Sequence, residues 1–355
     1  QKTHLNPKDH MTCRQILLAT LLTLTTGTGA LCAGVEWGGC LEPGRDQNLR
    51  LSFGVVSEFE GMIAETRRKL YDVTGSTWKQ DDAEIYSTSD FNLDGSYRAM
   101  GFSLDMAWAF VQLQLDSIFL NPTTSATARR DYYIAISDSI EYRGQSYDHL
   151  MIPAGAPFHA ELFGNMTELN FLLVPVGFNI GDFVRINPSW AFGLVLFGGR
   201  YEIDAGEPRG TKTYQNPPEE FVVGGQTSGL TILGAPQWGP GVDLHLGQTE
   251  GVQVRLRVQY LFASYDGGTG WFTTADHREK NLDFSHKNLR IRGQVEIPLN
   301  RVALTIGLQA QFIETDGTVS SSATDPADIL ARQERFDKEF SFRLQSLLGT
   351  IGITF

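Results

Sequence analysis

Three runs of alternating apolar and polar residues stand out in the second half of this 355-residue chain. They cover 252–262, 289–297 and 302–312, and each keeps a period of two over roughly ten residues. Half-buried strands of soluble proteins alternate in the same way, but they usually span only about five or six residues. A strand of about ten residues crosses a lipid bilayer when it is tilted by about 45°. The alternation therefore predicts an all-β fold, a transmembrane antiparallel up-and-down β-barrel.

The composition favours this barrel over a bundle of membrane helices. Mean hydropathy is −0.17, although aromatic residues reach 11% and glycine is frequent at 37 residues. A membrane protein is this polar on average only if about every second residue faces away from the lipid. The formal net charge of −12 makes nucleic acid an unsuitable partner, because binding to phosphates relies on lysine and arginine. We therefore expect no nucleic-acid partner.

The N-terminal residues have the pattern of a secretory signal. Residues 1–10 precede the first methionine and are interpreted as an upstream remnant without structure. A basic Arg14, an apolar run at 16–24 and a stretch of small residues follow, which predicts a signal peptide over 11–33. The apolar run is too short for a spanning helix, which needs about 20 residues. Residues 34–355 are then expected to form a single outer-membrane barrel domain.

Removal of residues 1–33 changes both the charge and the cysteine content. It takes away three basic residues and one acidic residue, so the net charge changes from −12 to −14. Cys40 becomes the only cysteine, so no disulfide can form within the processed chain.

The last residues of the chain carry an assembly pattern. Leu347, Ile351 and Ile353 share one face with the terminal Phe355. This resembles the C-terminal β-signal of bacterial outer-membrane proteins, a final amphipathic strand that ends in Phe. The resemblance implies a porin-like class, the bacterial outer membrane as location, contact with its lipid and recognition by the barrel-assembly machinery. It identifies no specific family.

Short turns alternate with long polar segments along the chain, which predicts short periplasmic turns, long external loops and both termini on the periplasmic side. The expected strands are approximately 48–63, 100–106, 111–119, 160–178, 189–203, 238–247, 252–265, 287–297, 302–314 and 339–355. Pro175 should lie near a strand end or at a bulge, because it has no N–H for the ladder. The segment 131–152 is interpreted as β-structure within a long external loop. If it spans the membrane instead, the closed count becomes twelve.

Polar positions of the downstream strands form the candidate site. The alternation predicts that the following residues face the lumen: Asp243, His245, Arg255, Arg257, Arg290, Arg292, Glu296, Gln309, Gln311, Arg343 and Gln345. We expect Asp243 and Glu296 to lie near the arginines. The first hypothesis is a narrow channel that lets small solutes or ions pass along this charged lining. The alternative is a structural or surface-binding protein, in which paired charges fill a narrow lumen and the external loops carry the function.

Two long external segments, 120–158 and 205–237, are the other candidates for function. The second is rich in Gly and Pro, and we expect it either to fold into the mouth of the barrel or to bind a partner. Asp325-Pro326 has the pattern of a helix start. No calcium-loop motif occurs, so we expect neither a metal nor a cofactor. The sequence leaves the oligomeric state open.

Catalysis has one candidate pattern. Some ten-stranded outer-membrane barrels are proteases that use Asp and His residues on the external rim. Asp276-His277 and the pair Asp283 and His286 belong to one polar loop, and an aspartate-oriented histidine can activate water. No second acidic pair can be placed beside them, and no serine accompanies His245 in its strand. We therefore expect no enzymatic activity.

Overall fold

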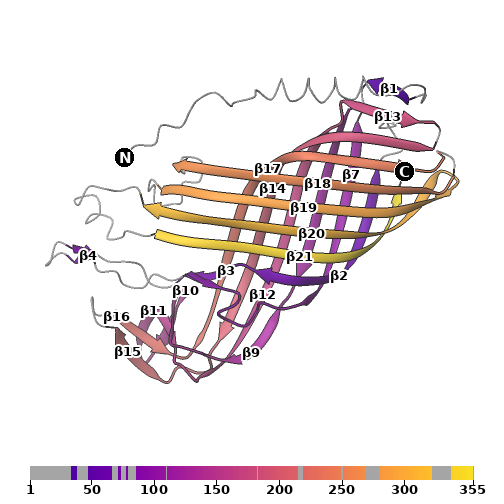
Figure 1. Cartoon of the computed structure of the whole chain (residues 1–355). Coiled ribbons are helices and arrows are strands. Elements are labelled where there is room, and N and C mark those ends of the chain that lie inside the picture. Colours follow the sequence, from indigo (N-terminus) through magenta and orange to yellow (C-terminus); the bar gives the residue numbers. More distant parts are fainter. Residues whose placement is uncertain are drawn as a thin grey trace, which may run out of the picture.

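The structure, a computed structural model, consists almost entirely of β-strands (Figure 1). It describes residues 33–37, 47–65, 71–72, 77–78, 85–108, 110–181, 183–214, 219–248, 251–268, 280–321 and 337–354. The expected upstream remnant, most of the signal peptide, the expected helix start at 325–326 and Phe355 lie outside these residues. No helix within the described ranges has the length and apolarity needed to cross a membrane.

Ten strands in the described part of the chain close into an antiparallel ring. In order around the ring they are β2 (Asn48–Glu60), β7 (Tyr97–Trp108), β8 (Val111–Leu120), β12 (Pro157–Leu173), β14 (Val184–Asp204), β17 (Gln226–Leu246), β18 (Gln253–Gly268), β19 (Lys280–Leu299), β20 (Val302–Ser321) and β21 (Asp337–Thr354). Asn48 on β2 lies opposite Thr354 on β21, and this pairing completes the ring. The prediction of a ten-stranded barrel is confirmed, and the alternative of twelve strands is wrong.

The short connections lie at the end of the barrel where the C-terminus is found (Figure 1). Pro175 follows the end of β12, as expected from its missing N–H, and β13 (Val176–Ile180) continues the pairing with β14. The other edge of β13 pairs with β1 (Ala33–Trp37). We take the short-turn end as the periplasmic end, because periplasmic turns of such barrels are short and external loops are long.

The outward face of the ring is an apolar belt. On β20 the outward positions are apolar from Val302 to Phe312, and Glu314 follows. At about 3.4 Å per residue and a tilt of about 45°, this stretch is about 24 Å tall, which matches the apolar band of a membrane barrel. Lys287 and Arg343 lie 3.6 and 3.8 Å from Glu314 and mark the external boundary of the belt with it. The ring therefore spans the membrane with its apolar side outward.

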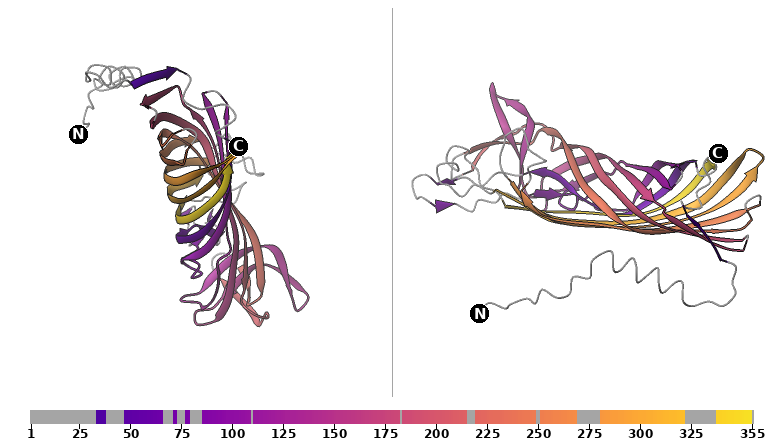
Figure 2. Two further views of the ribbon diagram at one scale, coloured as in Figure 1. Left: turned by 90° about the vertical axis from the view of Figure 1, so that its right-hand side faces the viewer. Right: turned by 90° about the horizontal axis from the view of Figure 1, so that it is seen from above.

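A second sheet lies at the external end, away from the C-terminus (Figures 1 and 2). Its four strands are, in order, β10 (Tyr132–Tyr142), β11 (Gln145–Ile152), β16 (Glu219–Val223) and β15 (Gly210–Tyr214). The segment 131–152 is thus β-structure within an external loop, as expected. The extent expected for the loop 205–237 is wrong, because residues 226–237 belong to β17 and form barrel wall.

Smaller strands complete the external end. They are β3 (Met62–Glu65), β4 (Tyr71–Asp72), β5 (Thr77–Trp78), β6 (Ile85–Ser87) and β9 (Thr123–Thr127). The strand β9 pairs with the external part of β12, and β3 pairs with β6.

Candidate functional site

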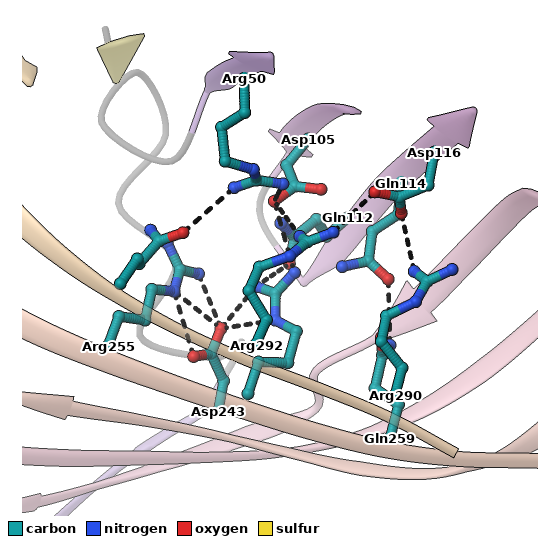
Figure 3. A network of polar contacts seen from close by, with 12 residues as sticks. Arg50, Asp105, Gln112, Gln114, Asp116, Asp243, Arg255, Gln259, Arg290 and Arg292 are labelled. Atoms are coloured by element: carbon teal, nitrogen blue, oxygen red, sulfur yellow. Dashed lines mark hydrogen bonds and ion pairs between the residues drawn. The ribbon is translucent and has the colours of Figure 1, made fainter. Parts of the chain in front are cut away.

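Inward side chains of the membrane-spanning part form a buried polar layer (Figure 3). We call the following residues the polar layer: Arg50, Asp105, Gln112, Gln114, Asp116, Glu168, Asn170, Gln237, Asp243, Arg255, Arg257, Gln259, Asn288, Arg290, Arg292, Gln294, Glu296, Gln309 and Gln311. They face the lumen because each alternates along its strand with residues of the apolar belt.

Asp243 on β17 is the first centre of this layer. Its carboxylate accepts hydrogen bonds from Arg255 at 2.7 Å and from Arg257 at 2.5 Å. His245 lies 3.4 Å from the same carboxylate, and Glu296 lies 3.8 Å from Arg255. The prediction that Asp243 and Glu296 lie beside the lumen arginines is therefore confirmed.

Two carboxylates from the upstream strands are the second centre. Asp105 on β7 accepts from Arg50 at 2.7 Å and from Arg292 at 3.2 Å. Asp116 on β8 accepts from Arg290 at 2.7 Å and from Arg292 at 2.6 Å. Figure 3 shows these arginines of β19 reaching across the lumen toward β7 and β8. Opposite walls of the barrel are thus joined by charge-assisted hydrogen bonds, which are the stronger kind.

Glu168 on β12 is the third centre. Its carboxylate accepts hydrogen bonds from Arg290 and Gln311. Asn288 and Gln237 also donate to it, each at 3.1 Å. A buried carboxylate needs this many donors, because burial removes the water that would otherwise solvate its charge.

The charges of the polar layer balance within the described residues. It contains five arginines and five carboxylates, so its formal charge is zero. The gap between Arg50, Asp105, Arg255, Arg257, Arg292 and Gln294 does not admit a water-sized sphere. The polar layer is thus neutral, and it is packed around this gap.

The lumen placement of Arg343 and Gln345 is wrong. Both share the parity of Leu347, which is exposed on the outward face of β21. Arg343 is 45% exposed and lies near Glu314 and Glu60, while Gln345 donates to Glu58. Side chains that differ by two positions share a face of a strand, so the outward face of Leu347 already excluded both from the lumen.

The structure places the other expected residues on the inward face, and their role as a channel lining stays a prediction. The inward residues are Asp243, His245, Arg255, Arg257, Arg290, Arg292, Glu296, Gln309 and Gln311. Leu347, Ile351 and Ile353 share the outward face of β21, as expected, and their role as an assembly signal stays a prediction.

His286 is not a loop residue, in contrast to expectation. It lies on β19 with its side chain inward, hydrogen-bonded to Thr315 at 2.8 Å and to Gln237 at 3.1 Å. Asp283 is an exposed residue of the same strand and has the opposite parity, so the two face opposite sides of the wall. Asp276 and His277 lie outside the described residues.

The residues that the sequence interpretation missed are those of the upstream strands. Arg50 and Asp105 each lie between two apolar neighbours along their strands, and that single polar position was the available signal for them. Asp116 and Glu168 have an apolar neighbour on one side only, Leu115 and Leu169, so their signal was weaker. The upstream carboxylates Asp105, Asp116 and Glu168 are the partners of the downstream arginines.

An apolar layer lies inside the barrel on the external side of the polar layer. We call the following inward residues, to which every strand of the ring contributes, the apolar layer: Val56, Phe59, Ala99, Ile118, Leu120, Leu162, Met166, Val195, Phe197, Ala235, Ala263, Phe284, Ile313, Phe342, Leu344 and Leu348. The rings of Phe59, Phe197 and Phe342 lie 5.1–6.1 Å apart, the usual range for packed aromatic pairs.

The external sheet packs on the same hydrophobic core. Tyr132, Ile134, Leu150, Ile152 and Val222 are almost completely buried there. The sheet is therefore a fixed part of the molecule, held by the hydrophobic effect.

Polar contacts hold the sheet as well. Arg130 lies 5.7 Å from the ring centroids of both Tyr86 and Tyr132 and 3.2 Å from Asp90. At the tip of the β10–β11 hairpin Arg143 and Gly144 are exposed, Tyr142 is partly buried against the hydrophobic core, and the Arg143 guanidinium lies 5.2 Å from the Tyr142 ring.

No protein-family model and no curated protein matches the chain. Among solved structures, it is similar to the outer membrane protease OmpT from Escherichia coli, at 8% sequence identity and a TM-score of 0.38. The alignment covers 87% of this chain and 97% of that one. The expectation that the chain is not an enzyme is therefore withdrawn, since the similar structure is that of a protease. At these values the likeness does not extend the protease activity to this chain.

The fold therefore rests on the strand pairing and on the two faces of the wall. A closed antiparallel ring leaves no backbone edge in the lipid, and its outward belt is apolar over the height of a bilayer. Lipid contact follows from that belt. The protein is a ten-stranded bacterial outer-membrane β-barrel.

Proposed function

We propose that the protein is a sealed barrel that carries its function on the external sheet, rather than an open channel. The observation that carries this proposal is the packing of the lumen by two successive layers. The polar layer is neutral, the gap among six of its residues does not admit a water-sized sphere, and the apolar layer lies between it and the external side. An ion that crossed would have to separate buried ion pairs and then enter an apolar region, and both steps are costly.

With the lumen sealed, the external sheet is the surface that remains available for binding. It is anchored through fully buried residues, and it ends in the hairpin tip Tyr142-Arg143-Gly144, where Arg143 and Gly144 are exposed and Tyr142 is partly buried. Aromatic and arginine side chains dominate the energetics of protein interfaces. Such a tip on a fixed base suits a surface-binding function, in which little conformational entropy is lost on association.

Single-channel recording in planar bilayers tests the sealed lumen. The refolded full-length protein is expected to give no conductance steps. A double variant, Phe59→Ala with Phe342→Ala, thins the apolar layer but leaves the polar layer intact, and it should also remain closed. A steady open current from the unaltered protein would overturn the proposal.

Binding at the tip is tested with the protein in lipid nanodiscs. A binding partner found in a screen supports the proposal if Tyr142→Ala with Arg143→Ala removes its binding. The matched control is Arg129→Ala, which changes an exposed arginine elsewhere on the external side. Equal binding by the tip variant and the control would contradict a function for the tip.

A further inference from the structure

One small polar cluster interrupts the apolar belt on the outward wall of β8 and β12. Asn165 donates to Ser117 at 2.8 Å, and Thr167 donates to the Asn165 side-chain oxygen at 2.7 Å. The Ser117 and Thr167 hydroxyl oxygens are 2.9 Å apart. Because the Thr167 hydrogen is used, Ser117 is the donor in this third contact. The three side chains therefore form a closed ring of hydrogen bonds, which lowers the cost of polar groups beside lipid.

An arginine adjoins this cluster at the external boundary of the belt. Arg200 on β14 is exposed and lies between Phe163 and Leu230, its direct cross-strand neighbours. Those two side chains are 56% and 76% exposed, so the apolar wall continues on both sides of the guanidinium. No hydrogen bond or ion pair of the Arg200 side chain is found among the described residues, in contrast to Lys287, which lies 3.6 Å from Glu314.

The wall between the arginine and the polar cluster is open. Gly198 is the next outward residue on β14 after Arg200, and it lies directly opposite Asn165. A Cβ built on Gly198 would meet no atom within 4 Å. A bound group can therefore approach the backbone at Gly198, between the Arg200 guanidinium on the external side and the Asn165 amide on the neighbouring strand.

We propose that this surface binds the headgroup of a phosphorylated lipid in the external leaflet. Arg200 pairs with a lipid phosphate, since guanidinium groups bind phosphate through parallel hydrogen bonds. The amide and hydroxyl groups of Asn165 and Thr167 face the ester or amide linkages, and the apolar belt below contacts the acyl chains. Lipid is the occupant because the surface is part of the membrane-facing wall.

Two carboxylates limit where the phosphate binds. Glu161 and Glu202 are the next pair of outward-facing residues on β12 and β14, on the external side of Phe163 and Arg200. Glu202 accepts a hydrogen bond from Gln226, and both carboxylates repel a phosphate. The phosphate therefore lies on the Gly198 side of Arg200. This surface is separate from the hairpin tip, so the inference does not depend on the proposed function.

Native mass spectrometry of the full-length protein in phosphatidylcholine nanodiscs tests the inference. One sample contains lipid A, a second contains phosphatidylglycerol, and a third receives inorganic phosphate alone. The unaltered protein is expected to retain at least one of the phosphorylated lipids through detergent release. Arg200→Gln should reduce that retention by about fivefold, since a charge-assisted hydrogen bond is lost. Arg200→Lys should keep most of it.

Lys287→Gln is the matched control, because it removes a boundary cation that already has a carboxylate partner. Its retention should stay within about twofold of the unaltered protein. Asn165→Leu with Thr167→Val should lower retention without loss of the folded band on an unboiled gel. Equal losses for Arg200→Gln and Lys287→Gln would overturn the proposal. So would retention no greater than that of phosphatidylcholine, or full displacement of the lipid by inorganic phosphate.

Discussion

The membrane-spanning half and the external half of the barrel have opposite polarity along the same strands. On β20, Gln309 and Gln311 face inward where Phe312 faces outward, and one step further Ile313 faces inward where Glu314 faces outward. On β19, Asn288 and Phe284 make the same change across the row of Lys287. The strands continue without a break while their two faces exchange character.

The difference shows how the surroundings of a strand decide which face must be apolar. Where lipid surrounds the wall, the outward side is apolar, and the lumen receives the polar half of the alternation. Where water surrounds the wall, the ordinary hydrophobic effect applies and the inside becomes apolar. The inward face of the barrel is therefore polar within the membrane and apolar outside it, as in the core of a soluble protein. The Lys287–Glu314 pair marks the boundary.

The largest expected effect comes from a partner removed in the polar layer. Glu168→Leu leaves Arg290 with Asp116 alone and leaves the Asn288 and Gln237 amides with one acceptor fewer. We expect the free energy of unfolding to fall by about 3–5 kcal/mol, as for other broken buried ion pairs. The measurement is denaturant unfolding followed by the heat-modifiable band shift. Glu168→Gln keeps an acceptor and should cost about half as much. Equal effects below about 1 kcal/mol would mean that solvent screens the charges of the polar layer.

The apolar layer should respond to lost volume instead of lost charge. Phe59 packs against Phe197 and Phe342, with centroid distances of 5.5 and 6.1 Å. Phe59→Ala is expected to lower the free energy of unfolding by about 3 kcal/mol and Phe59→Leu by about 1 kcal/mol. The same unfolding assay measures both. If Leu cost as much as Ala, the apolar layer would depend on the aromatic rings rather than on filled space.

The external sheet should lose stability locally when its cation is removed. Arg130→Gln abolishes the contacts with the Tyr86 and Tyr132 rings and the ion pair with Asp90, a loss of about 1 kcal/mol. Hydrogen exchange should become faster in residues 85–93 and stay unchanged in the belt. Arg129→Gln removes one exposed hydrogen bond to Asn92 and serves as the control. Faster exchange throughout the barrel would contradict a local role of Arg130.

The smallest effect is a pH dependence confined to the external side. The Ala154 backbone N–H, followed by Lys212, lowers the pKa of Asp131 below its usual range. A lowered pKa stabilises the folded form above the unfolded-state pKa of about 4, and the contribution is lost as the pH falls through the lower folded value. Hydrogen exchange at Ala154, corrected for intrinsic rates, should speed up as the pH falls below about 4 and be pH-independent in Asp131→Asn. The same rise in the variant would assign it to another group.

The sequence was sufficient to predict the strands of the barrel wall but not the side-chain contacts inside the lumen. Period-two alternation located all ten strands, because a lipid-facing belt forces every second residue to be apolar. It also placed Asp243 beside the downstream arginines, since those strands are consecutive. The contact of Arg290 with Glu168 was beyond such reasoning, because the two lie on strands that are not neighbours in the ring.

Other errors had local causes. Arg343 was assigned to the lumen although the parity of β21 excludes it, so the available signal was not applied through the whole strand. Residues 226–237 looked like loop because of Gly229, Gly234 and Pro236, yet they are barrel wall paired with β14. Outside the belt the alternation reverses polarity, and a strand that continues into water loses the apolar outward signature that would identify it.

The pairing of β2 with β21 has a consequence for the order of events during folding. Asn48 and Thr354 meet across about three hundred intervening residues, so this contact has the highest sequence separation in the ring. Until it forms, both terminal strands present unpaired N–H and C=O groups to the bilayer, and each such group is costly there. Loop-closure entropy also makes so distant a contact late and slow. The first strand of the ring therefore cannot complete its pairing until the last strand has been synthesised. A chain without its final strand would not form a stable nine-stranded ring.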